Sequence, residues 1–535
     1  MAQPEQTEQV HDYASVSTDQ KKLPGAEIII GLVGAIGTDL DNVTNVLKKR
    51  LNGYAYTSSI VKVSEIILKF SEPVEFTCEY DRLHRLINWG NELREKTGDA
   101  GFLAKGVAKS ISEVRKGLKP IQERRAFIIK SLKNAEEVKV LRKIYGNGFY
   151  LIGVYSDKKM RLTNLTDGQI TEEDAEKLIK RDEDEKIGHG QHTRDTFQMA
   201  DFFIDYSDEV NMRSYIHRIL DLIFGHPHHT PTVGEYAMFM AFCASLRSAD
   251  LSRQIGAAIC LGEDIIATGV NDCPKYGGGL YWQYYDANLK CYCDAQRGKD
   301  YQRGEDPNKA EIQKIAKKIV GTLKELPENS KISRIADTFK ELSEESETEF
   351  LNILKRPNLL GGLTEFNRAV HAEMEALIMC ARNNISCKGA DMYVTTFPCH
   401  ACAKHIIAAG IKTVVYIEPY PKSKTFELFD DSTTQKEGGN EKGDKVLLVP
   451  FFGVGPRKFI EMFSMKFGTL EKKIRKDVCE KAVTFDAGDA NIRDPLSEKS
   501  YLEREKDAVG EFCEVEINLG GKCSTIKVTK MDQYF

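Results

Sequence analysis

The sequence predicts an α/β protein of more than one domain, and three observations support this prediction. The chain has 535 residues, which at roughly 150 residues per domain suggests two to four domains. Short apolar runs that are rich in β-branched residues alternate with segments of helical pattern in both halves of the chain. A Pro- and His-rich break at 225–231 separates the two halves, so we place a domain boundary at residue 226.

The first half is predicted to form a three-layer α/β domain over residues 26–225, after a polar tail at 1–25 that is predicted to be disordered. Apolar strands that alternate with helices are typical of a parallel sheet that is covered on both faces. The predicted strands are 26–33, 125–129 and 149–155, and the predicted helices are 41–51 and 135–145. The charged stretch 156–225 is predicted to add further helices and a connection.

The second half is predicted to form a three-layer α/β/α domain over residues 226–470, followed by a C-terminal extension at 471–535. Its pattern is a helix, a two-stranded hairpin, and then an alternation of helices and strands. The predicted helices are 233–247, 369–383 and 400–409, and the predicted strands are 255–261, 265–270, 391–396, 413–417 and 446–451. A lysine- and glutamate-rich segment at 283–357 predicts inserted helices or a mobile excursion, and the polar stretch 422–444 predicts a loop.

The composition narrows the class of partner and the compartment. The formal net charge is −5 and the pI is about 6.2, which disfavours duplex nucleic acid as the main partner and favours a small-molecule substrate. We find no apolar run of bilayer length, and Met1 to Lys22 is too polar for a secretory signal, so we expect a cytoplasmic protein with no membrane partner. Thirteen cysteines without secretory context predict reduced thiols and metal ligands.

Two short motifs together indicate a catalytic metal site. They are His371-Ala372-Glu373 in a predicted helix and Pro398-Cys399-His400-Ala401-Cys402 at the start of another. His371, Cys399 and Cys402 are the natural ligands of a catalytic Zn²⁺, which keeps a fourth position for water and lowers the pKa of that water to about 7. Glu373 is placed to move protons beside it. The alternatives are a purely structural zinc site and a chance match, and the joint pattern of H-x-E and P-C-x-x-C disfavours both.

The flanking segments resemble those of the deoxycytidylate (dCMP) deaminases, members of the zinc-dependent cytidine deaminase superfamily. The resemblance includes 368–377, 393–396 and 403–407 around the two motifs, and 247–250, 254–259 and 268–271 upstream. It covers about residues 235–455, interrupted by the insert. The resemblance implies the cytidine deaminase fold, a zinc cofactor, and a free deoxycytidine nucleotide as the substrate.

The resemblance also implies substrate contacts, each with an ordinary alternative. Asn271 would contact the sugar, although an asparagine after a strand is also a turn former. Arg247 and its neighbour Ser248 would lie near the phosphate, although Arg247 could form a plain salt bridge. Tyr416 would stack or bond near the phosphate, although a strand tyrosine is often part of the core.

Some dCMP deaminases carry a second, structural zinc near the active-site strand, and this chain has cysteines in the matching region. Cys273, Cys291 and Cys293, with one of His226, His228 or His229, are therefore predicted candidates for a second tetrahedral site. The alternative is a set of ordinary thiols.

A glycine-rich loop after the first predicted strand resembles the phosphate loop of P-loop nucleotide kinases. The loop contains Gly31, Gly34, Gly37 and Thr38. It departs from that motif where the second glycine, the lysine and the hydroxyl residue would stand, because these positions are occupied by Asp39, Leu40 and Asp41. We therefore expect a nucleotide-sensing or scaffolding loop, or a plain glycine-rich turn, in place of a working kinase.

A P-loop-like domain joined to a dCMP-deaminase-like domain resembles the bacterial anti-phage deoxycytidine nucleotide deaminases. That resemblance implies deamination of dCTP as well as dCMP, depletion of a DNA precursor, and control by the N-terminal domain. It also implies a nucleotide effector, an inhibitory RNA or protein regulator, and a homo-oligomer. Three alternatives stay open: a housekeeping dCMP deaminase, a polynucleotide cytidine deaminase, and a non-catalytic nucleotide sensor that keeps zinc for stability.

Overall fold

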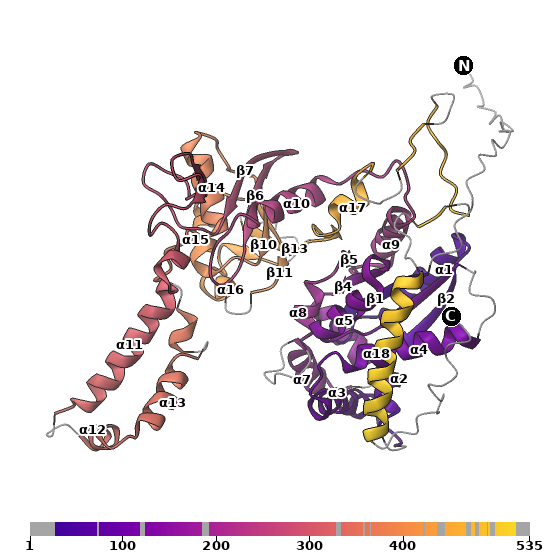
Figure 1. The fold of residues 1–535 in the computed structure, drawn as a ribbon, viewed down its shortest axis with the longest axis horizontal. Coiled ribbons are helices and arrows are strands. Elements are labelled where there is room, and N and C mark those ends of the chain that lie inside the picture. The colour runs from indigo at the N-terminus through magenta and orange to yellow at the C-terminus, as the bar shows by residue number, and fades with distance from the viewer. Residues whose placement is uncertain are drawn as a thin grey trace.

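The protein forms two α/β lobes with a long helical projection on the second lobe (Figure 1). The structure is a computed structural model. It describes residues 27–71, 74–117, 124–168, 170–183, 192–327, 333–356, 359–363, 365–420, 423–435, 445–466, 472–476, 481–488, 490–492 and 498–519. The tail predicted at 1–25 lies outside these residues, as do parts of the predicted 422–444 loop and of the 471–535 extension. In the described part of the chain, the helices are too short or too polar to cross a membrane.

The first lobe is built on a six-stranded sheet of order β14-β5-β4-β1-β3-β2. The strands are β1 (Ile28–Gly34), β2 (Thr57–Lys62), β3 (Arg125–Lys130), β4 (Phe149–Tyr155), β5 (Phe202–Asp205) and β14 (Gly453–Val454). Neighbouring strands are parallel except for β14, which runs antiparallel to β5. The three predicted strands are confirmed. The sequence pattern missed β2, an edge strand with one buried residue, and β5, which has only four residues.

Helices cover both faces of this sheet, as the side chains of β1 show. Ile28, Ile30 and Leu32 pack against α1 (Leu40–Gly53) and α9 (Glu209–Ile223). Ile29 and Val33 belong to the core on the opposite face. That core is made with α2 (Val63–Leu68), α4 (Phe102–Gly117), α5 (Ala135–Tyr145) and α18 (Glu498–Asn518). The remaining helices of the lobe are α3 (Glu79–Thr97), α6 (Lys158–Asp167), α7 (Glu172–Glu183) and α8 (Thr193–Phe197).

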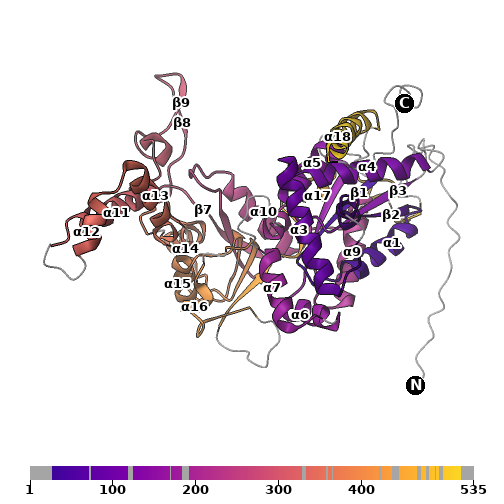
Figure 2. The same cartoon turned by 90° about the horizontal axis from the view of Figure 1, so that it is seen from below.

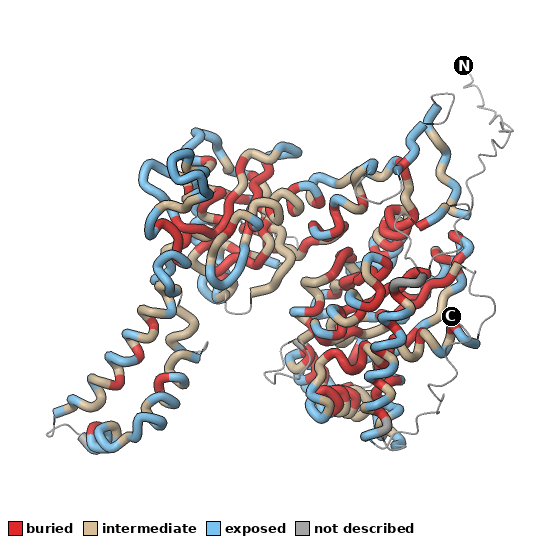
Figure 3. Tube along the Cα trace, viewed as in Figure 1, coloured by how far each residue is buried: buried red, intermediate tan, exposed pale blue. Residues whose placement is uncertain are grey.

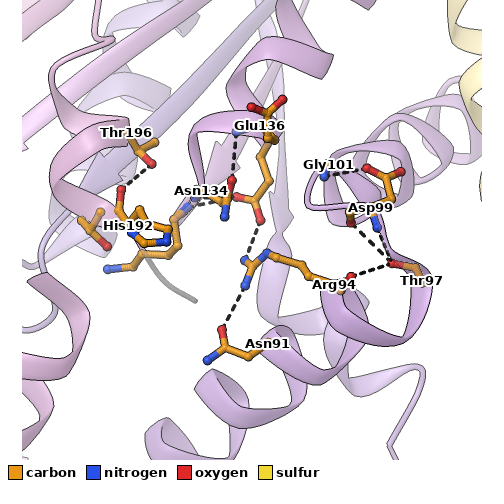
Figure 4. A network of polar contacts seen from close by, with 12 residues as sticks. Asn91, Arg94, Thr97, Asp99, Gly101, Asn134, Glu136, His192 and Thr196 are labelled. Atoms are coloured by element: carbon orange, nitrogen blue, oxygen red, sulfur yellow. Dashed lines mark hydrogen bonds and ion pairs between the residues drawn. The ribbon is translucent and has the colours of Figure 1, made fainter. Parts of the chain in front are cut away.

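A buried polar network joins α3 to the start of α5 (Figure 4). Asn134 caps α5, and Glu137 returns its carboxylate to the backbone of the capping residue, so two N–H groups at the helix start are bonded. Arg94, which is 2% exposed, donates to the Glu137 carboxylate at 2.7 Å and to Asn91 at 3.3 Å. The cap and the ion pair therefore depend on the same carboxylate.

The second lobe is built on a mixed six-stranded sheet of order β12-β13-β11-β10-β6-β7. The strands are β6 (Gly256–Leu261), β7 (Asp264–Val270), β10 (Asp391–Thr396), β11 (Thr413–Glu418), β12 (Thr433–Thr434) and β13 (Val446–Pro450). β6 and β7 form the predicted hairpin, and β10, β11, β13 and β12 run parallel to one another. The predicted strands of the second half are thus confirmed, within one residue at their ends.

Two glycines show why helices lie close on both faces of this sheet. A Cβ on Gly256 would lie 1.9 Å from the carbonyl oxygen of Ala241, in α10 (Val233–Ser245). A Cβ on Gly269 would lie 2.0 Å from the carbonyl oxygen of Ala372, in α14 (Ala372–Arg382). Gly269 pairs with the neighbour of Gly256, so the two glycines face opposite sides of the sheet. The three layers follow from this alternation, with α15 (His400–Ala408) packed beside α14.

The predicted insert is present and projects away from the sheet (Figures 1 and 2). It contains a small hairpin, β8 (Tyr284–Asp286) and β9 (Cys291–Cys293), and the helices α11 (Pro307–Lys324), α12 (Ser333–Lys340) and α13 (Glu344–Leu354). Its helices share a small core of Ala316, Val320 and Leu351, and much of their surface is exposed (Figure 3).

The end of the chain returns to the first lobe. After the short helices α16 (Thr425–Leu428) and α17 (Phe459–Phe463), α18 packs on α4 and α5, seen in yellow in Figure 1. Its buried Glu505 bonds to Arg115, which also pairs with Glu27. Residues 453–454, which the sequence pattern assigned to the second domain, complete the sheet of the first. The two predicted domains are therefore interlocked by the C-terminal part of the chain.

Candidate active site

The three predicted zinc ligands converge at the starts of two neighbouring helices. His371 is the N-cap of α14, Cys399 is the N-cap of α15, and Cys402 lies in the first turn of α15. The Nδ1 atom of His371 lies 3.2 Å from the Cys402 sulfur and 3.4 Å from the Cys399 sulfur. The Pro-Cys turn after β10 therefore brings the C-x-x-C pair to His371 from about thirty residues away.

The donor set fits zinc. One ligand atom from each of the three residues lies within 4.8 Å of the other two, which a single ion can bridge with Zn–S bonds of about 2.3 Å and a Zn–N bond of about 2.0 Å. Cys399 is 8% exposed and Cys402 is fully buried, so the two sulfur ligands are shielded from bulk water. Three protein ligands leave a fourth position open, as catalytic zinc sites require.

The electrostatics of the group favour a thiolate. Hydrogen bonds from Cys402 and His371 lower the pKa of Cys399 to about 4. The bond with Cys399, together with the nearby Glu373 carboxylate, raises the pKa of His371 to about 9. Both cysteines also lie at a helix N-terminus, where the backbone dipoles stabilise negative charge. The hydrogen bond with Cys399 and burial raise the pKa of Cys402 well above its ordinary value, so without a metal the thiolate is placed on Cys399.

Glu373 lies beside this group at the second position of α14 and is only 4% exposed. Burial raises its pKa above the ordinary value, and the neighbouring Cys399 thiolate raises it further. A buried carboxyl group beside the ligand set is placed to take up and return a proton, which is the role of a general acid and base.

The group lies in a pocket of about 650 Å³, and residues of three parts of the chain line this pocket. The helix starts and strand ends supply His371, Glu373, Cys399, Thr396, Phe397 and Asn271. The loop before β6 supplies Asp250, Leu251, Ser252, Arg253 and Ile255. The insert and the residues that follow it supply a further wall with Asp300, Asp306, Asn308, Lys309, Ile312, Gln313, Lys355, Gly361 and Leu363.

The predicted substrate contacts separate into one pocket residue and three others. Asn271 lines the pocket, and its amide also donates to the Arg253 carbonyl at 2.8 Å and accepts from the Ile255 N–H at 2.7 Å. Ser248 lies just behind it and donates to the Asn271 carbonyl at 2.7 Å. Asn271 therefore holds the shape of the 253–255 loop, whatever contact it makes to a ligand.

Arg247 and Tyr416 are not among the residues that line the pocket. The guanidinium carbon of Arg247 lies 3.5 Å from the ring centroid of Trp282, in a cation–π contact. The Tyr416 ring packs edge-on against Phe397, with the centroids 4.9 Å apart, so it supports a pocket residue from behind.

The structure does not bring the predicted second set of cysteines together. Cys291 and Cys293 are neighbours on β9, with their sulfur atoms 3.3 Å apart. Cys273 is buried, and burial raises its pKa to about 11, with the nearby Asp300 adding to the effect. Among the described residues, these three cysteines do not form a group with converging ligand atoms, and neither do they converge with His226, His228 or His229.

The glycine-rich loop of the first lobe is held by contacts within the chain. A Cβ on Gly31 would lie 2.8 Å from Leu132, so this glycine allows close packing in the sheet. Gly37 has φ +85°, a conformation that favours glycine. Lys133 donates to the Gly34 carbonyl at 2.8 Å, and Thr38 closes a turn by donating its N–H to the Ala35 carbonyl at 3.0 Å.

The sequence analysis did not predict two sets of residues that the structure places at candidate sites. Lys309 and Lys355 line the pocket, but they stand among many lysines of the insert and nothing in their spacing marks them. Asp221 converges with His226 and His229 on a second group of metal-ligand type. The two histidines were visible in the sequence as part of a His-rich turn, whereas Asp221 belongs to the helix before it.

These observations describe a His/Cys/Cys group in the second lobe that could hold a metal beside a buried carboxyl group. In agreement, residues 231–418 match the family model of the cytidine and deoxycytidylate deaminase zinc-binding region. This matched segment runs from the turn before α10 to the end of β11 and contains His371, Glu373, Cys399 and Cys402.

The chain is also similar to named proteins over short stretches. It is 51% identical over 67 residues to ComE operon protein 2 of Bacillus subtilis (strain 168), covering 12% of this chain and 35% of that protein. It is 53% identical over 55 residues to the deoxycytidylate deaminase of Enterobacteria phage T4, covering 10% and 28%. The chain thus spans about a third of the length of these curated relatives. Among solved structures, the dCMP deaminase from cyanophage S-TIM5 in apo form is 16% identical, with a TM-score of 0.21, covering 42% of this chain and all of that one.

Proposed function

We propose that the protein is a zinc-dependent hydrolase that deaminates the free deoxycytidine nucleotides dCTP and dCMP to dUTP and dUMP, with release of ammonia. One observation carries the proposal: the buried carboxyl group of Glu373 lines the same pocket as His371 and Cys399. A purely structural zinc site has no use for such a group. The family match over 231–418 and the similarity to deoxycytidylate deaminases support the substrate class.

The reaction replaces the exocyclic amine of cytosine by an oxygen from water. The water oxygen forms a bond to C4, the C4–N bond breaks, and the amine leaves as ammonia. When bound by His371, Cys399 and Cys402, zinc supplies Lewis acidity that makes water a nucleophile near neutral pH. Glu373 takes one proton from the water as its oxygen bonds to C4 and delivers that proton to the ring nitrogen N3. It then takes the second proton from the new C4 hydroxyl and delivers it to the amine, which leaves as ammonia while the C4 carbonyl forms.

The insert favours a nucleotide with several phosphates. The pocket volume of about 650 Å³ lies in the range of small-molecule sites, which is roughly 300–1,000 Å³. Lys309 and Lys355 bring two ammonium groups to the insert wall, which also carries the carboxylates of Asp300 and Asp306, and we assign the phosphate contacts to the two lysines. We therefore assign the phosphate end of the substrate to this wall and include dCTP as a substrate.

The biological role that we propose is depletion of dCTP in the cytoplasm as a defence against phage. Such an activity starves DNA synthesis, so it has to be held off in healthy cells. We assign this control to the first lobe, acting with a nucleotide effector or an inhibitory RNA or protein, in a homo-oligomer. The interlocking of the two lobes through β14 and α18 supports mechanical coupling between them.

A polynucleotide substrate is the second candidate, and one observation favours it. Several aromatic side chains between residues 276 and 292 are exposed, and bases of a single strand stack on such groups. These exposed residues are Tyr276, Trp282, Tyr284, Tyr285 and Tyr292. They do not line the pocket, which is why we rank this candidate below free nucleotides. The remaining candidates are a housekeeping dCMP deaminase and a zinc-stabilised nucleotide sensor.

One set of assays separates these functions. The purified full-length protein is incubated with dCMP, dCTP, CMP, CTP and single-stranded DNA or RNA, and loss of the cytosine amine is followed by absorbance and ammonia release. Turnover of dCTP supports the proposal, and turnover of dCMP alone supports the housekeeping enzyme. Turnover confined to polynucleotide, or none at all with zinc present, would overturn it. Phage infection of cells with and without the gene, with dCTP measured by mass spectrometry, tests the defensive role.

A further inference from the structure

The Pro- and His-rich turn at 225–231 follows directly on α9, at the junction of the two lobes. Here Asp221, His226 and His229 each direct a ligand atom toward the others, and these atoms all lie within 4.8 Å of one another. We propose that this group is a second metal site, which binds Zn²⁺ or a similar divalent transition metal with water completing the coordination. It is separate from the His371 group and does not depend on the proposed function.

The Asp221 carboxylate has one oxygen held by hydrogen bonds and the other directed at a histidine, which is an arrangement common among metal-binding carboxylates. Its Oδ1 atom accepts hydrogen bonds from the Tyr54 hydroxyl and from Arg50 Nη2. Its Oδ2 atom faces His229, whose Nε2 lies 3.1 Å away. Carboxylates that bind metals are commonly held by such bonds to the atom that is not a ligand, because these bonds set the orientation of the group.

The distance of 3.1 Å between His229 Nε2 and Asp221 Oδ2 is compatible with a shared metal ion as well as with a direct hydrogen bond. A tetrahedral zinc ion with bonds of about 2.05 Å places two ligand atoms about 3.3 Å apart. Metal binding would therefore displace the shared proton between His229 and Asp221 and would require only a small movement of either side chain.

His226 completes the set. Its ring lies 4.2 Å from the His229 ring, and Phe485 packs 4.4 Å from it on another side. Within the described part of the chain, the His226 ring makes one hydrogen bond. Its Nδ1 atom accepts the backbone N–H of His228 at 3.2 Å, which is long for such a bond. The Nδ1 lone pair accepts this bond, so a metal bound at that nitrogen would replace only a long contact with the His228 N–H.

The surroundings also determine how tightly the site holds an ion. Arg50 neutralises Asp221, and Lys473 adds a further positive charge near His226. The three ligand side chains are partly exposed, so water screens these charges. The His371 group has two thiols and deeper burial, so we expect a chelator to remove the ion of the Asp221 group first.

An ion here would fasten the junction of the lobes. The turn already contacts the segments 472–476 and 481–488, because His228 Nε2 bonds to the Val483 carbonyl at 2.8 Å and Arg475 donates to the Pro227 carbonyl at 3.0 Å. Ligation by two residues of the turn and one of α9 would fix the position of the turn on that helix. The role that follows is structural, with an effect on stability before any effect on catalysis.

Metal analysis of the full-length protein tests the proposal. After growth with zinc and gel filtration, we expect about two zinc ions per chain in the wild type and about one in His226→Ala and His226→Gln. His217→Ala is the matched control, since His217 is an exposed histidine one turn before Asp221 on the same helix and lies outside the group. It should keep both ions.

Two further measurements make the outcome decisive. A limited chelator titration should remove one ion early from the wild type and lower its melting temperature, with no early loss in His226→Gln. With Co²⁺ in place of zinc, the early-leaving ion should lack the near-ultraviolet absorption of cobalt–thiolate bonds. One zinc ion in both the wild type and the His226 variants, all folded by circular dichroism, would overturn the proposal and leave a hydrogen-bonded cluster. Thiolate absorption for the early-leaving ion would equally overturn it.

Discussion

The carboxylate of Asp182 accepts a hydrogen bond from the backbone N–H of Ile36, at 2.8 Å, inside the glycine-rich loop of the first lobe. Asp182 belongs to α7, and its side chain is only 1% exposed. Its other oxygen accepts from Lys133 at 2.8 Å and from Thr193 at 3.1 Å. A negative group from the chain thus occupies a backbone donor of the loop, where a phosphate loop would present such donors to a nucleotide.

This relationship predicts a stability effect. Asp182→Ala leaves Lys133 without its carboxylate partner and Ile36 without an acceptor, so the first lobe should lose about 3 kcal/mol of unfolding free energy. The chain has two tryptophans, so a Trp282→Phe background leaves Trp89 in the first lobe as the fluorescence reporter of urea unfolding. Glu173→Gln, at an exposed position of α7, should change the free energy by less than about 0.5 kcal/mol. Equal stability of the two variants would contradict the prediction.

Glu373→Gln should separate metal binding from turnover. The amide keeps the size of the side chain but cannot take a proton from water, so we expect the zinc content to stay unchanged and kcat to fall by about 10²-fold or more. Zinc is measured by mass spectrometry, and turnover by loss of the cytosine amine. A Glu375→Gln variant is a poor control because Glu375 pairs with Arg382, so exposed Glu427→Gln is preferred. Retained activity in Glu373→Gln would show that another group moves the protons.

The insert wall predicts a phosphate-dependent effect. Lys309→Glu combined with Lys355→Glu should lower kcat/KM for dCTP by about 10²-fold or more, since two charge-assisted bonds worth about 1.5–3 kcal/mol each sum to about 3–6 kcal/mol. The loss should be smaller for dCMP and absent for deoxycytidine, which has no phosphate. Lys317→Glu combined with Lys318→Glu, at two exposed positions of α11 outside the pocket lining, serves as the charge-matched control. Equal losses for all three substrates would mean that these lysines do not meet the phosphates.

The return of the chain to the first lobe predicts that α18 is part of its core. Phe512 is 1% exposed and stacks on Phe102 with ring centroids 4.7 Å apart. Phe512→Ala should therefore cost about 3–5 kcal/mol of stability, measured by the same urea unfolding. Asp507→Ala, on the exposed side of α18, should cost less than about 0.5 kcal/mol. If Phe512→Ala unfolds like the wild type, α18 does not hold the lobe together in solution.

Much of the second lobe could be predicted because its signals are local. The strands and helices around the zinc group follow from runs of apolar residues and their periods, and α14 and α15 begin within three residues of the predicted positions. The ligand set His371, Cys399 and Cys402 follows from two short spacings, and the structure brings these side chains together. Local spacing suffices here because each motif lies at the start of one helix.

The sequence by itself therefore determined the α/β class, most of the strands and the residues able to hold zinc beside Glu373. Only the tertiary structure decided that the insert walls the pocket, that Asp182 reaches Ile36, and that β14 and α18 return to the first lobe. It also decided that Asp221 meets the His-rich turn, and that Arg247 packs on Trp282 outside the pocket. The physical reason is the same in each case. These contacts depend on how separate elements pack against one another, and side-chain periodicity records which face of an element is buried but not which element buries it.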